Sequence, residues 1–247
     1  MSLRNRVALV TGGSRGIGRG LALKLAQDGA RIAIAYRSNK AAAQQTLRQL
    51  QAGGADCVAV ETDVTDSLRC DQLVKTVADR YGRVDIVVNN VGDFRWGVLG
   101  ESALPDWQSI FASNLFTVLY TCRAVLPHMR KARWGRIINM GAVGAERAFG
   151  QAKISAYAAA KAAVVALSRS LALEEAKNGI TVNVVNPSSI DENELTLEEA
   201  RRIRDARFPI GRPPTVEDVA ATVAFFASEE AEYVTGQVVN VSGGWLL

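Results

Sequence analysis

The 247-residue sequence predicts one α/β domain, a doubly wound parallel sheet of seven strands with helices on both faces. Two observations favour this fold class. Short runs of β-branched and other apolar residues alternate with longer helical segments from one end of the chain to the other. The short runs are apolar without interruption, which is typical of parallel strands buried on both faces. No internal repeat or low-complexity tract interrupts the alternation, so we expect a single domain over residues 1–247.

The expected elements follow in regular succession. The strands are predicted over Val7–Val10, Arg31–Tyr36, Cys57–Glu61, Val84–Asn89, Arg136–Met140, Thr181–Val185 and Gln237–Val241. Helical periodicity predicts helices over Gly16–Asp28, Lys40–Gln51, Asp66–Tyr81 and Trp107–Arg130, and one that includes Tyr157–Leu173. Residues 188–214 are polar and lack strand character, which favours a small helical lid over a linker. A disordered loop is the alternative for that segment.

Composition places the chain among folded globular proteins and excludes several functions. Apolar residues make up 48% and charged residues 22%, which excludes disorder as the main state. A net charge of +4 is too small to indicate a nucleic-acid partner. Three widely spaced cysteines and one histidine give neither a metal-site pattern nor a disulfide framework, so we expect no metal and a reducing, cytoplasmic setting. The start lacks a signal-peptide pattern, and we expect no membrane partner.

A glycine-rich turn separates the first predicted strand from the first helix. Glycines at this point permit a tight turn and close backbone approach, and the helix N-terminus can bind a pyrophosphate. The turn therefore predicts a dinucleotide site. Its candidate contacts are Gly12, Ser14, Arg15, Gly16, Ile17 and Gly18.

The end of the second strand indicates which dinucleotide binds. An acidic residue is expected there when the adenosine ribose carries a free 2′-hydroxyl, but the chain has Arg37 and Ser38 after Tyr36. A guanidinium favours a 2′-phosphate and hence NADP(H). Arg15, inside the glycine turn, offers a second positive charge. The alternative is that Arg37 is only solvated surface.

Tyr157 and Lys161 lie at i and i+4 in a strongly helical stretch, so their side chains share one helix face. A nearby ammonium stabilises a phenolate, and we expect it to lower the pKa of Tyr157 from about 10 toward neutrality. The tyrosine can then exchange a proton with a carbonyl or alcohol oxygen while a hydride moves. An exposed tyrosine above a solvated lysine is the alternative.

These motifs and several others stand in a fixed order along the chain. The further ones are Asp63-Val64, Asn89-Asn90-Val91-Gly92, Asn114, Asn183-x-x-Asn186-Pro187, Pro214–Val219, Tyr233-Val234-Thr235-Gly236 and Ser242-Gly243-Gly244. Together they resemble the short-chain dehydrogenase/reductase family, with its Rossmann-type domain, over nearly the whole chain. Within it the chain is similar to the 3-oxoacyl-acyl-carrier-protein reductases and related carbonyl reductases.

The resemblance implies a role for each matching residue. Asp63 and Val64 would border the adenine, and Asn90, Val91 and Gly92 would line the cofactor. Tyr157 would be the acid/base, Lys161 would hold the nicotinamide ribose, and Asn114 would keep a relay water near Lys161. Pro187 would begin the loop beside the nicotinamide. The family also assembles through its long helices, and the helix with Tyr157–Leu173 is apolar on more than one face, so we expect a homotetramer or homodimer.

The chain departs from the family after the fifth strand. The family places there a serine that donates a hydrogen bond to the substrate oxygen, and the matching residue here is Ala142. No serine or threonine occurs from Asn139 to Ile154, and the spacing to Tyr157 is longer than usual. Ser188 or Ser189, after the sixth strand, could replace the lost donor. Ser155 lies two positions before Tyr157 on the helix and points elsewhere.

Two functions therefore stay open. The first is an NADP-dependent oxidoreductase that moves a hydride between nicotinamide and a small-molecule carbonyl or alcohol, such as a 3-oxoacyl thioester or a small ketone. The second is an NADP-binding regulator that has lost turnover together with the serine. The intact acid/base pair favours the enzyme, and Ala142 favours the regulator. The sequence does not define the substrate, because fold and cofactor site do not determine the pocket.

Overall fold

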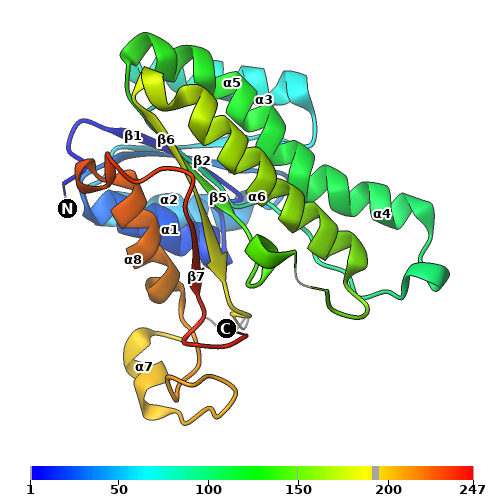
Figure 1. Cartoon of the computed structure of the whole chain (residues 1–247). Helices are drawn as coiled ribbons and strands as arrows, with labels where there is room; N and C mark the ends of the chain where they lie inside the picture. The colour runs from blue at the N-terminus through cyan, green and yellow to red at the C-terminus, as the bar shows by residue number, and fades with distance from the viewer. Residues whose placement is uncertain (1, 149, 191–194, 247) are drawn as a thin grey trace.

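The computed structural model describes residues 2–148, 150–190 and 195–246, and within these ranges seven strands form one parallel sheet (Figure 1). The order across the sheet is β3-β2-β1-β4-β5-β6-β7. The strands are β1 (Val7–Thr11), β2 (Arg31–Tyr36), β3 (Cys57–Glu61), β4 (Ile86–Asn89), β5 (Gly135–Met140), β6 (Ile180–Pro187) and β7 (Val238–Val241). The predicted doubly wound α/β class is confirmed, and each predicted strand lies within about two residues of its observed bounds.

Helices cover both faces of the sheet (Figure 1). One apolar core joins one face to α1, α2 and α8, and a second core joins the other face to α3, α5 and α6. The helices are α1 (Gly16–Gln27), α2 (Lys40–Ala52), α3 (Ser67–Tyr81), α4 (Leu104–Phe111), α5 (Thr117–Ala132), α6 (Ser155–Glu175), α7 (Leu197–Arg202) and α8 (Val216–Ala227).

The long helix predicted over Trp107–Arg130 is confirmed as a helical stretch over Leu104–Ala132, but a π-helical turn that was not predicted lies inside it. The structure has α4, then a π-helical turn at Ala112–Phe116, then α5. The Asn114 side chain donates to the Ile110 carbonyl at 3.0 Å, so it competes for an acceptor of the preceding turn. Such π-turns inside helices occur frequently at functional sites.

Helix α8 has a local signal that the sequence analysis did not use. Thr215 and Asp218 form a capping box, in which each side chain accepts from the other residue's backbone N–H. The helix packs closely on α1, since a Cβ at Gly20 would lie 2.1 Å from Val216 Cγ1. Gly20 therefore permits the close approach of the two helices.

The segment expected to form a lid contains the short helix α7, which projects from the body beside the carboxyl ends of β6 and β7 (Figure 1). Thr196 and Glu199 form a capping box at its start. Residues 191–194 of the segment lie outside the described ranges.

Two helical stretches, Leu104–Ala132 and Ser155–Asn178, are long and apolar enough to cross a membrane by length and composition alone. Both belong to the layer that covers one face of the sheet, where Val118, Val125, Val164 and Leu171 are buried in the core. Packing on the sheet accounts for their apolar character, as in the core helices of other doubly wound domains.

A cluster of charged side chains lies at the amino ends of β1, β4 and β5. The Asp85 carboxylate is fully buried; it accepts from the Val7 amide at 2.8 Å and from Arg83 Nε at 2.7 Å. Arg136 is also buried, 2% exposed, with its guanidinium 4.3 Å from the Trp134 ring centroid. The hydrogen bond from the Val7 amide to Asp85 joins the start of β1 to the residue before β4, at the edge of the sheet opposite the glycine turn.

Candidate functional site

The glycine turn is built by close backbone approach at the carboxyl end of β1. Gly12 has a φ of 64°, in the left-handed region that favours glycine. A Cβ at Gly18 would lie 2.3 Å from the Gly12 carbonyl oxygen, so α1 can only start against the turn with glycine there. Asn90 Nδ2 donates to the Thr11 carbonyl at 3.1 Å and ties the turn to the end of β4. The strand order reverses between β1 and β4, and α/β sheets bind ligands at the carboxyl ends of strands where such a reversal occurs.

A cavity of about 330 Å³ opens beside this turn. It brings together residues from the ends of β1, β2, β3 and β4. Eight predicted cofactor contacts line it: Gly12, Ser14, Arg15, Arg37, Ser38, Asp63, Val64 and Val91. Six polar lining residues were not predicted: Tyr36, Asn39, Thr62, Thr65, Asp93 and Ser113. The predicted contacts Gly16, Ile17, Gly18, Asn90, Gly92 and Pro187 do not line the cavity itself.

Two arginines at the cavity carry unpaired positive charge. Arg15 and Arg37 are exposed, and among the described residues neither side chain has a hydrogen bond or an ion pair. Burial acts to raise the pKa of Asp63, but hydrogen bonds from Thr65 and the charge of Arg37 hold this pKa below its usual value. Arg37 and Asp63 are thus electrostatic neighbours, and the cavity rim is suited to an anion.

Asn114 and Lys161 converge on Gly92. A Cβ at Gly92 would lie 2.4 Å from Asn114 Oδ1 and 3.3 Å from Lys161 Nζ. Asn114 Nδ2 donates to the Asp93 carbonyl at 2.8 Å, and Lys161 Nζ donates to the Met140 carbonyl at 2.8 Å. Asn114 Oδ1 is buried and accepts no hydrogen bond from the described residues, an unmet acceptor of the kind found where a water or ligand binds.

Tyr157 lies one helical turn before Lys161 on α6, with its ring centroid 5.6 Å from Lys161 Nζ. The expectation of a low tyrosine pKa is wrong for the protein chain. Burial raises the pKa of Tyr157 to about 12 and lowers the pKa of Lys161 to about 8. Folding removes both side chains from water. The loss of hydration destabilises the phenolate and the ammonium by more than their mutual attraction stabilises them. Tyr157 is therefore a neutral phenol at pH 7, the form that donates a proton.

Ala142 follows β5 within a turn in which its carbonyl accepts from the Ala145 amide at 3.0 Å. The parallel register of β5 and β6 pairs Met140 with Val185, so Ala142 and Pro187 each lie two residues beyond the last paired position. Ser188 comes next and is 4% exposed. Its Oγ is buried and has no hydrogen-bond partner among the described residues.

An unpredicted polar contact anchors the turn that follows Ala142. The Glu146 carboxylate accepts from Asn186 Nδ2 at 3.0 Å and from Asn240 Nδ2 at 2.9 Å. Burial acts against the charged form, but the hydrogen bond from Asn240 holds the pKa of Glu146 below its usual value. No local pattern identifies this contact, because its three residues belong to different parts of the chain.

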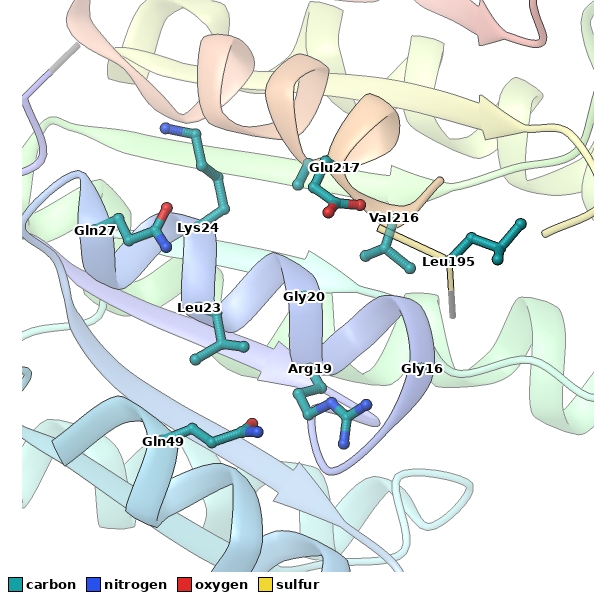
Figure 2. A pocket seen from close by; sticks show the side chains of 11 residues that line it. Gly16, Arg19, Gly20, Leu23, Lys24, Gln27, Gln49, Leu195, Val216 and Glu217 are labelled. Atoms are coloured by element: carbon teal, nitrogen blue, oxygen red, sulfur yellow. The ribbon is translucent and has the colours of Figure 1, made fainter. Parts of the chain in front are cut away.

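A separate groove of about 400 Å³ runs along α1, with Leu195 and the start of α8 on one side and Gln49 of α2 on the other (Figure 2). Of the predicted site residues only Gly16 lines it. Lys24, one of its charged side chains, is paired with Asp28 at 2.6 Å. The cavity at the carboxyl ends of the strands, rather than this larger groove, therefore holds the candidate site.

Comparisons with known proteins agree with this geometry. A family model described as enoyl-(acyl carrier protein) reductase matches residues 12–246. The 3-oxoacyl-(acyl-carrier-protein) reductase of Staphylococcus aureus is 38% identical over 240 residues, 96% of each chain. The corresponding reductase of Synechocystis is 38% identical over 248 residues, 100% of this chain and 99% of that protein.

Solved structures give the same assignment. A putative short-chain alcohol dehydrogenase from Sinorhizobium meliloti superposes with a TM-score of 0.90 at 28% identity, covering 99% of this chain and 98% of that one. The acetoin dehydrogenase YohF of Salmonella typhimurium superposes with a TM-score of 0.89 at 32% identity, covering 98% and 96%. The chain belongs to the short-chain dehydrogenase/reductase family, oxidoreductases that act on CH–OH and C=O groups.

Proposed function

We propose that this chain is an NADP(H)-dependent reductase of a small-molecule carbonyl compound, which also oxidises the corresponding alcohol. The observation that carries the proposal is the convergence of Asn114 and Lys161 on Gly92, with Lys161 one helical turn from the half-buried phenol of Tyr157. An acid, a cation and an unmet acceptor at one point are what proton transfer to a carbonyl oxygen requires.

The residues at the carboxyl edge of the sheet fit a dinucleotide. Because Gly12 and Gly18 have no side chains, the backbone amides of the turn are accessible where a pyrophosphate would lie. The cavity beside the turn has room for an adenosine. Arg15 and Arg37 would hold a 2′-phosphate, Asp63 and Val64 would border the adenine, and Lys161 would hold the nicotinamide ribose. When bound, a nicotinamide supplies or accepts the hydride.

Residues of the chain would supply the proton that the carbonyl oxygen gains during reduction. Tyr157 would donate its phenolic proton to the oxygen of the substrate as that oxygen becomes an alkoxide. Lys161, an ammonium below its pKa of about 8, would stabilise the phenolate that remains. Lys161 would then give a proton to the phenolate, and a water held by the unmet Oδ1 of Asn114 would reprotonate Lys161 with a proton from solvent, which restores both groups.

The substrate proposed is a carbonyl compound such as a 3-oxoacyl thioester or a small ketone. The names of two relatives support this choice, one a 3-oxoacyl-(acyl-carrier-protein) reductase and the other an acetoin dehydrogenase. Both names describe a carbonyl–alcohol pair. The free, buried cysteines are consistent with the cytoplasmic setting that we also propose.

A specific observation favours a second candidate, an NADP-binding regulator with little turnover. Ala142 cannot donate a hydrogen bond to a substrate oxygen, and loss of one such donor costs about 10²–10³ in rate. An enzyme that has lost this donor still binds its cofactor, because the glycine turn and the arginines are unaffected.

The deciding experiment follows NADPH oxidation against a panel of carbonyl compounds, together with direct measurement of NADPH binding. We expect turnover with wild type and a fall of about 10²–10⁴-fold in Tyr157→Phe with unchanged NADPH affinity. NADPH binding without any turnover would favour the regulator. Absence of NADPH binding would contradict both functions.

A further inference from the structure

Three aromatic side chains form a continuous row that ends at Tyr157. The Phe94 and Tyr157 rings meet edge to face, with centroids 4.9 Å apart and an interplanar angle of 78°. Trp96 meets Phe94 in the same way, at 5.0 Å and 86°. Edge-to-face contacts at these distances are favourable aromatic geometries. The row runs from the protein surface to the side chain proposed as the proton donor.

The loop that carries Phe94 and Trp96 is held at both ends. The Asp93 amide donates to Oγ of Ser113, a residue of the π-turn, at 3.3 Å, and the Gly97 amide donates to the Lys153 carbonyl at 2.8 Å. Lys153 belongs to the loop before α6 and has a φ of 69°, an uncommon conformation for a residue other than glycine. The loops before α4 and before α6 are thus joined to each other, and the aromatic row is a fixed surface.

The exposed surface of the aromatic row is apolar and uncharged. Phe94 is 48% exposed and Trp96 is 61% exposed, large fractions for rings that also pack against neighbours. Arg95, between them in the sequence, is paired with Asp106. A fixed, exposed apolar surface is typical of a site that binds an apolar group.

We propose that Phe94 and Trp96 recognise the substituent on the substrate's carbonyl carbon, and that this substituent is aromatic or similarly bulky and apolar. The inference rests on the proposed function, because it takes Tyr157 as the donor to the carbonyl oxygen. When the Tyr157 phenol donates a hydrogen bond to the carbonyl oxygen, the substituent on the carbonyl carbon comes close to the Tyr157 ring. The neighbouring ring there is Phe94, which contacts Tyr157. A second aromatic ring prolongs the row and displaces water from the two exposed faces.

The test measures binding of two ketones by calorimetry, alone and with NADP⁺, which cannot reduce a ketone: acetophenone, with an aromatic substituent, and butan-2-one, without one. We expect acetophenone to bind wild type at least about tenfold more tightly, the factor that one aromatic contact with its buried area supplies. Phe94→Ala and Trp96→Ala should each remove most of this preference, because they lower the affinity for acetophenone by a larger factor than the affinity for butan-2-one. Leu99→Ala, in the same loop and 62% exposed, is the matched control and should keep the preference.

Equal affinity of wild type for the two ketones would overturn the inference, as would acetophenone binding that survives loss of both rings. A change of molecular mass in Phe94→Ala or Trp96→Ala with unchanged ketone affinity would also overturn it, because the row would then be a contact between copies of the chain. Failure of the proposed function is seen separately, as absence of NADPH binding in a titration without ketone.

Discussion

Arg37 carries the proposed preference for a phosphorylated dinucleotide. It is exposed, unpaired among the described residues, and stands at the cavity where β2 ends. Arg37→Glu should weaken NADPH binding by about tenfold or more through lost charge-assisted hydrogen bonds, and should spare or improve NADH binding. Dissociation constants for both dinucleotides check this. Wild-type protein that binds NADH as tightly as NADPH would refute the assignment.

The buried lysine predicts a pH dependence. The pKa of Lys161 is lowered to about 8, so its ammonium is present below pH 8 and lost above it. The kcat/KM for reduction should therefore fall as pH rises through about 8, while Tyr157, with a pKa of about 12, stays protonated. Lys161→Arg keeps its charge and should move the fall to higher pH. An unchanged fall in that variant would assign the titration to another group.

Ala142 should limit turnover. Ala142→Ser restores a hydroxyl after β5 and should raise the rate of carbonyl reduction by up to about 10²–10³-fold, with unchanged NADPH affinity. If wild type is already fast and Ala142→Ser has no effect, the donor is elsewhere, and Ser188 has a buried hydroxyl with no partner among the described residues. Ser188→Ala in the wild-type background then separates the two cases, since it slows reduction only if Ser188 is the donor.

At the scale of elements, the glycine turn and α1 approach so closely that one added methyl group should affect both stability and NADPH binding. A Cβ at Gly18 would lie 2.3 Å from the Gly12 carbonyl and 2.6 Å from Asn90 Nδ2. Gly18→Ala should lower the free energy of unfolding by about 1–3 kcal/mol and weaken NADPH binding. Thermal unfolding and NADPH titration measure the two effects. Gly100→Ala, where a Cβ meets open space, is the control; equal stability of the two variants would contradict the packing argument.

The elements differ in how well their sequences predict them. Strands and the glycine turn follow from periodicity and spacing, which act within a few residues. The π-turn at Ala112–Phe116 breaks a stretch whose periodicity is helical throughout, because the Asn114 side chain takes a backbone acceptor. The raised pKa of Tyr157 depends on burial, and the Phe94 contact depends on a loop far away in sequence. Such properties arise from folding of distant segments, so no local pattern contains them.

At the scale of the whole molecule, exposed apolar side chains support assembly into a homodimer or homotetramer. Leu173, near the end of α6, is 83% exposed, and Phe116, at the start of α5, is 39% exposed. Val239, on the edge strand β7, is 36% exposed. Light scattering at micromolar concentration should give a dimer or tetramer mass, and Leu173→Glu should shift it toward the monomer. A monomeric wild type would refute this expectation.

The buried charge cluster at the amino ends of the central strands bears on how this protein can change. Asp85 accepts from the Val7 amide, and Arg136 packs on Trp134, at the edge of the sheet opposite the glycine turn and the residues around Tyr157. Energetic effects of substitutions that share no partners are close to additive. Substitutions at the carboxyl edge of the sheet, including ones around Phe94 that change substrate preference, should therefore leave the contribution of the distant cluster to the free energy of unfolding unchanged. Successive substitutions at that edge can then change the activity while the fold stays stable.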